Sequence, residues 1–226
     1  MPVFFWELLT FATMIFNDMM KRTVYRSLLL LLILVNAVAV RGQTMQQWRD
    51  SLSVLSRLIT QSPQSTDLRL RKAAVNIELD QWEYAVEEYG RVLELDARSL
   101  PALYYRAYAH NHLRRYDAAR ADYERFLSLM PRHFEARFGL AMVLRNLGRR
   151  TEVLDELNRL VEQFPDSALA FAARADYEAE QGQLELALYD WDEALRLAPA
   201  NTEFLSARQR VADAMKNGRR GRKKQQ

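Results

Sequence analysis

The chain repeats one pattern of small, large apolar and polar positions every 34 residues, four times in succession and without an insertion. Each unit contains two stretches with the apolar spacing of an amphipathic helix, followed by a helix-breaking position. The units begin at Thr66, Leu100, Phe134 and Ala168. The sequence therefore predicts an array of helix pairs.

Five positions of the unit carry the repeat. Two antiparallel helices approach closely only where both offer small side chains, large side chains then fill the space to the next unit, and proline ends the second helix. The small positions are the eighth, held by Ala73, Ala107, Ala141 and Ala175, and the twentieth, held by Ala85, Ala119, Val153 and Ala187. The large ones are the twenty-fourth, held by Tyr89, Tyr123, Leu157 and Trp191, and the twenty-seventh, held by Val92, Phe126, Leu160 and Ala194. The thirty-second position holds Ala97, Pro131, Pro165 and Pro199.

This pattern resembles the tetratricopeptide repeat (TPR), in full over residues 66–201 and in part on both sides. The resemblance implies an all-α fold, a right-handed α-solenoid of antiparallel helix pairs. A composition with only 7 Gly and 6 Pro agrees with an all-α chain. The sequence departs from the family at position four, where the usual Trp is replaced, and at position seven, which is basic in three units (Lys72, Arg106 and Arg174). We expect these long side chains to cover apolar surface while their charged ends stay in water.

The repeat divides the chain into segments. Repeat arrays need capping helices, because an uncovered terminal unit exposes its stacking face to water. We expect an N-terminal capping helix in 43–65, TPR 1 in 66–99, TPR 2 in 100–133, TPR 3 in 134–167, TPR 4 in 168–201, a C-terminal capping helix in 202–216 and a disordered basic tail in 217–226.

The N-terminal region predicts export. Residues 20–42 combine a basic start, Lys21 and Arg22, with a 13-residue apolar stretch over 28–40 that only Asn36 interrupts. This stretch has the length of the apolar core of a signal peptide and is too short to span a membrane. Cleavage after Gly42 or Ala39 fits the small-residue rule, and we favour Gly42. We expect Met20 to be the true start, 1–19 to be a spurious extension, and the product to be periplasmic. The alternative is a chain anchored in the membrane by its N-terminal segment.

Charge is unevenly distributed along the chain. The formal net charge is +3, but residues 43–216 hold 23 Lys and Arg against 27 Asp and Glu. Residues 217–226 hold five basic side chains and no acid. This tail is a candidate for binding anionic surfaces or nucleic acid. No aromatic residue is interleaved with its charges, so we do not expect a nucleic-acid partner.

Candidate chemistry is sparse. The two histidines of one predicted helix, His110 and His112, are two residues apart and point to different faces, so they cannot jointly hold a metal ion. The chain has no cysteine, no glycine-rich phosphate loop and no nucleophile elbow. We therefore predict no catalytic residues, no metal site and no cofactor.

The resemblance implies that positions two, five, nine, twelve and thirteen of each first helix line a concave face. Aromatic and methionine side chains with a few polar groups suit recognition of a peptide or helix. The candidate contacts in the middle two repeats are Tyr104, Tyr108, Asn111, His112, Phe138, Met142 and Arg145. For Tyr104 and Phe138 the alternative is simple packing between neighbouring helices.

Together these features predict a non-catalytic adaptor or scaffold that binds a protein partner in its groove. The partner is a peptide, a helix or a subunit of an envelope complex. Two alternatives stay open: an anionic-surface or nucleic-acid binder acting through the basic tail, and a structural spacer in an envelope complex.

Overall fold

The computed structural model describes residues 44–223, with side chains over 44–217. The predicted extension and signal peptide at 1–42 lie outside the described residues. The chain divides into two compact units, Met1–Arg57 and Leu58–Gln226. A helix over residues 44–61 crosses this boundary, so the expected N-terminal helix is present, while its capping role stays a prediction. The repeats lie in the second unit.

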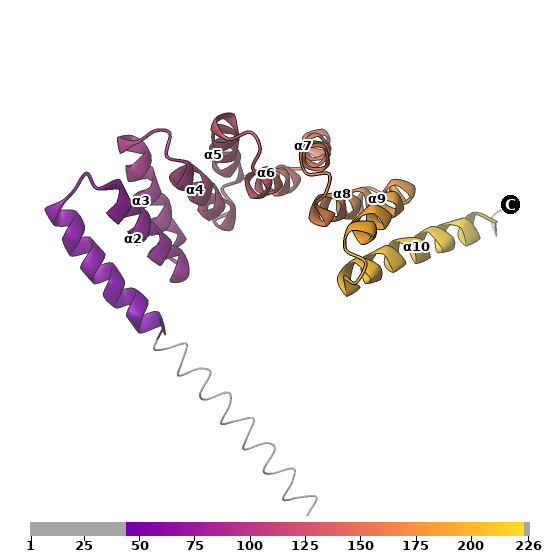
Figure 1. Cartoon of the computed structure of the whole chain (residues 1–226), viewed down its shortest axis with the longest axis horizontal. Helices are drawn as coiled ribbons and strands as arrows, with labels where there is room; N and C mark the ends of the chain where they lie inside the picture. Colours follow the sequence, from indigo (N-terminus) through magenta and orange to yellow (C-terminus); the bar gives the residue numbers. More distant parts are fainter. Residues whose placement is uncertain (1–43, 224–226) are drawn as a thin grey trace, which may run out of the picture. The chain divides into compact units, whose positions relative to one another are not determined.

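Every regular element in residues 44–223 is a helix, which confirms the predicted all-α solenoid class. Figure 1 shows the labelled helices following one another along the chain. Each labelled helix packs against the next one in sequence. The bounds are α2 Thr66–Glu78, α3 Trp82–Leu95, α4 Leu100–His112, α5 Tyr116–Leu129, α6 Phe134–Asn146, α7 Arg150–Gln163, α8 Ala168–Glu180, α9 Leu184–Leu197 and α10 Thr202–Lys223.

The first helices of the four units begin at the four residues where the repeat begins in the sequence. The small side chains at positions eight and twenty are all fully buried between the two helices of a unit. The chain reverses after each first helix through a left-handed residue at position fifteen, where φ lies between 55° and 76°. Two units use glycine there, Gly148 and Gly182, and two accept the strain of a side chain, at Asp80 and Arg114.

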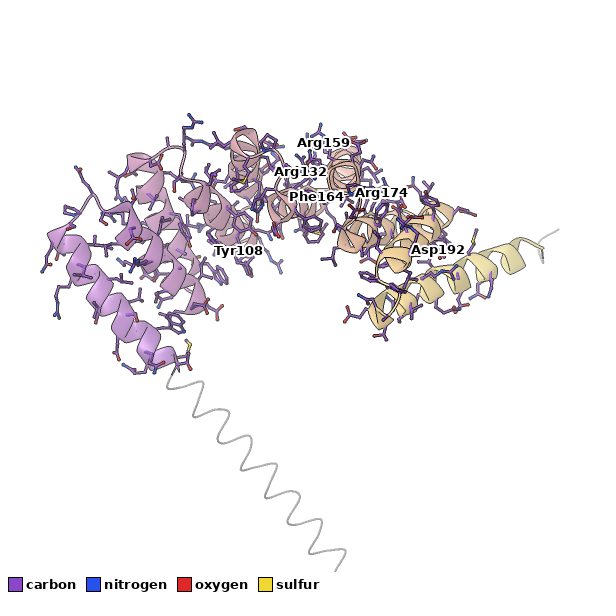
Figure 2. The ribbon with its side chains drawn as sticks, viewed as in Figure 1. Tyr108, Arg132, Arg159, Phe164, Arg174 and Asp192 are labelled. Carbon is purple, nitrogen blue, oxygen red and sulfur yellow. The ribbon has the colours of Figure 1, made fainter. Side chains whose placement is uncertain are left out.

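The charged ends of the basic residues at positions four and seven form ion pairs, which our expectation did not include. Each pairs with an acid at position twenty-three of the same unit, so the charge is satisfied inside the helix pair. Arg106 binds Asp122 with two hydrogen bonds of 2.7 and 2.6 Å, and Arg174, labelled in Figure 2, binds Asp190 with two of 2.6 and 2.8 Å. The equivalent pairs are Arg69 and Lys72 with Glu88, and Arg137 with Glu156.

The C-terminal helix is longer than predicted. We expected it to end at Lys216 and to be followed by a disordered tail, but α10 continues to Lys223. The added segment contains no proline, and Gly218 and Gly221 weaken a helix by only about 1 kcal/mol each. Basic residues at a helix C-terminus also interact favourably with the helix dipole. Within the part of the chain that the structure describes, no helix combines the length and apolarity needed to cross a membrane.

One buried carboxyl on α8 has an oxygen without a hydrogen-bond partner. Glu178 lies near the Arg174–Asp190 pair, and its Oε2 is buried without a hydrogen bond to any described residue. Burial and the negative charge of Asp190 raise the pKa of Glu178 to about 7, against the opposing effect of Arg174. The folded chain therefore holds a proton on this carboxyl at pH values where the unfolded chain has released it.

This proton predicts a pH dependence of stability. Because the pKa is higher in the folded state, the contribution of Glu178 is complete below about pH 4.5 and is lost as pH rises through about 7. The Glu178→Gln variant removes this loss, so it should gain roughly 1–3 kcal/mol over wild type between pH 5 and pH 8. Urea unfolding of both proteins at several pH values measures the difference. A wild-type curve that stays parallel to the variant curve would contradict the assignment.

Candidate functional site

A groove runs along the first helices at the C-terminal end of the array. It has a volume of about 700 Å³ and is formed by α6, α8 and α10, with the buried ring of Trp191 from α9 at its base. The other lining residues include Phe134, Phe138, Met142 and Arg145 of α6, Leu169, Ala172, Ala173 and Asp176 of α8, and Glu203, Phe204, Ser206, Ala207 and Arg210 of α10.

The groove exists because small side chains stand where other units have large ones. Position five holds Tyr104 and Phe138 in the second and third units but Ala172 in the fourth. The first helices also approach one another directly at α2 with α4 and α4 with α6, whereas close approaches between α6 and α8 are sparse. A truncated side chain between separated helices leaves a hollow that the neighbouring side chains do not fill.

Two apolar side chains stand exposed at this groove. Phe138 is 37% exposed and stacks on Phe134 with ring centroids 6.3 Å apart. Leu169 is 60% exposed. Apolar side chains gathered in a hollow, unlike ones scattered singly over a surface, indicate a place where another molecule binds.

Some charged side chains of the groove form ion pairs and others do not. Arg145 of α6 forms an ion pair with Glu180 of α8, which links the two first helices across the groove. Asp176 of α8 is exposed and makes no ion pair or hydrogen bond with any residue that the structure describes. Arg210 of α10 donates a hydrogen bond to Ser206 Oγ at 2.9 Å and meets no carboxylate among the described residues.

The hollow continues beyond these residues. A second hollow of about 400 Å³ shares Arg145, Asp176, Trp191 and Arg210 with the first and reaches Ala214 of α10. The two together form one path along α8 and α10, which we call the C-terminal groove.

The structure separates the seven predicted contact residues into two groups. Phe138, Met142 and Arg145 line the C-terminal groove. The remaining four, Tyr104, Tyr108, Asn111 and His112, lie on α4 and do not line it.

The four residues on α4 mostly pack against other side chains. His112 stacks on Trp82 with ring centroids 3.9 Å apart, and Tyr108, labelled in Figure 2, contacts both rings. Tyr104 packs against Tyr123, Phe126 and His133, and burial raises its pKa. It also lines a separate hollow of about 470 Å³. Asn111 is half-buried.

Sequence reasoning missed the contribution of α10. Ala207 and Arg210 occupy positions six and nine of a fifth, incomplete unit, so the repeat itself could have located them. The prediction places no contacts on this helix, because a terminal helix is expected only to cover the array. Leu169 and Asp176 were on the predicted stripe but outside the two middle repeats that we favoured.

In residues 44–223 no three His, Cys, Asp or Glu side chains lie close enough together to hold a metal ion. The groove presents apolar rings, alanines and a few charges, an arrangement that holds a ligand in place.

The fold and groove define an α-solenoid of antiparallel helix pairs with a hollow on its first helices. Two family models, both describing the tetratricopeptide repeat, match residues 77–129 and 112–177. The chain therefore belongs to the tetratricopeptide-repeat family. Proteins of this family are generally non-catalytic adaptors that bind other proteins or peptides.

Solved structures share this fold at low sequence identity. YrrB, a TPR protein with an unusual peptide-binding site, has a TM-score of 0.58 and 20% identity over 72% of this chain and 84% of its own. MamA has a TM-score of 0.64 and 16% identity over 70% of this chain and 93% of its own. A TPR protein from Parabacteroides merdae has a TM-score of 0.61 and 20% identity over 76% of this chain and 68% of its own. No curated protein sequence matches the chain.

Proposed function

We propose that this protein is a non-catalytic scaffold that holds a peptide or helix of a partner protein in the C-terminal groove. The observation that carries the proposal is the hollow over Trp191, with Phe138 and Leu169 exposed at it. A partner side chain that enters this hollow removes apolar surface of both molecules from water.

The size of the groove supports a peptide or a helix as the bound element. Hollows of about 700 and 400 Å³ that share residues have room for several side chains of one segment. The likeness to YrrB, which has a peptide-binding site, supports the same class of ligand.

The proposal makes a direct prediction for two groove residues. Replacing both Phe138 and Leu169 by alanine removes two apolar anchors. An anchor at the centre of an interface contributes about 2 kcal/mol or more to the binding free energy. Recovery of a partner from native cell extract by the tagged full chain should fall at least ~10-fold. Quantitative mass spectrometry of the captured proteins measures this.

A matched control comes from the second helix of the last unit. Leu186 and Tyr189 of α9 are 54% and 63% exposed and do not line the groove. The Leu186→Ala, Tyr189→Ala double variant should recover the partner as wild type does. Undiminished recovery by the Phe138 and Leu169 variant, with both variants folded by circular dichroism, would refute the groove as the binding site.

We also propose that the scaffold works outside the cytoplasm, in the periplasm. The support is the basic start and 13-residue apolar stretch of residues 20–42. N-terminal sequencing of the mature protein, purified through a C-terminal tag, should give Gln43 as the first residue. Replacing Leu31 and Leu32 by lysine should leave the chain uncleaved. A wild-type product in the cytoplasmic fraction that retains residues 20–42 would contradict export.

A further inference from the structure

Three charged side chains of the C-terminal groove lack ion-pair partners among the described residues: Glu203, which lines only the larger hollow, and Asp176 and Arg210. Asp176 and Arg210 both line the two connected hollows and both are exposed. Arg210 is held only by its hydrogen bond to Ser206 Oγ. They occupy position nine of two successive units, 34 residues apart, so they face the groove from neighbouring first helices.

Several other charges in and around the groove are satisfied within the protein. Arg145 is paired with Glu180, so its charge is not available to a ligand unless that pair breaks. On other faces of α8 and α10, Arg174 is paired with Asp190 and Arg208 with Asp192. Among the charged residues that line both hollows, Asp176 and Arg210 thus differ from Arg145 in pointing unneutralised charge at the groove.

At position nine of the repeat the residues change from uncharged to charged along the array. The first three units hold Ala74, Tyr108 and Met142 there, which are uncharged, and the next two hold Asp176 and Arg210. In a hollow with apolar walls, fixed charges attract opposite charges and repel like charges more strongly than on an open surface. A ligand of a single sign would therefore meet repulsion from one of the two residues.

We propose that the partner segment is dipolar: a bulky apolar residue that enters the hollow over Trp191, with a Lys or Arg on one side facing Asp176 and an Asp or Glu on the other facing Arg210. This inference rests on the proposed function of the groove. The two charges fix the direction of the bound segment, because a reversed segment would place like charges together.

The test uses a phage-displayed library of random peptides as the probe. The library is selected against the full chain and, separately, against the Asp176→Arg, Arg210→Asp double variant. Wild type should enrich peptides with an apolar residue between a basic and an acidic one. The variant should enrich the same arrangement with the signs exchanged. A wild-type peptide should bind the variant at least ~10-fold more weakly, and exchanging the peptide's own charges should restore its affinity.

The Phe138→Ala, Leu169→Ala variant distinguishes a failure of the dipolar-ligand proposal from a failure of the proposed binding groove. Peptides that need Phe138 and Leu169 but show no charge pattern, or bind the charge-reversed variant equally well, would refute the dipolar ligand and leave the groove intact. Selected peptides that bind the Phe138 and Leu169 variant as tightly as wild type would refute the groove itself. Both charged residues are exposed, so their reversal leaves the core packing unchanged.

Discussion

The whole array depends on the close approach of two helices at one pair of small side chains. In each unit the residues at positions eight and twenty are fully buried against each other's helices, and a larger side chain there would push the pair apart. A second close approach occurs between the second and third units. Tyr123 packs so tightly against Gly139 of the next first helix that a Cβ atom at Gly139 would lie 2.7 Å from the Tyr123 Cζ atom.

Partly buried ion pairs adapt this framework to an unusual sequence. The family's Trp at position four is absent, and in three of the four units a base at position seven reaches an acid at position twenty-three. The acids of these pairs are more buried than the bases, so removing a base leaves a carboxylate with little access to water and without its partner. The base and the acid must therefore change together, even though a replacement of both by apolar residues can be tolerated.

The sequence was sufficient for the helices and insufficient for the groove. The period of 34 predicts where each first helix begins, since the small positions and the helix-breaking position recur without insertion. The prediction of the site favoured large side chains. Tyr104, however, packs against neighbouring rings. The principal hollow forms where the side chains of Ala172 and Ala207 are small. The partners of Lys72 and Arg106 lie 16 residues away on another helix, so only the fold reveals their pairing.

The central claim is that a partner binds over the C-terminal groove rather than on the second helices of the units. The direct measurement is photo-cross-linking in native cells from a photoreactive residue placed at Ser206, which lines the groove, and in a separate protein at Tyr189, which does not. Both positions are exposed, so both probes are equally free to react. The account predicts a specific protein adduct from position 206 and none from position 189. An adduct from position 189 with none from position 206 would contradict it.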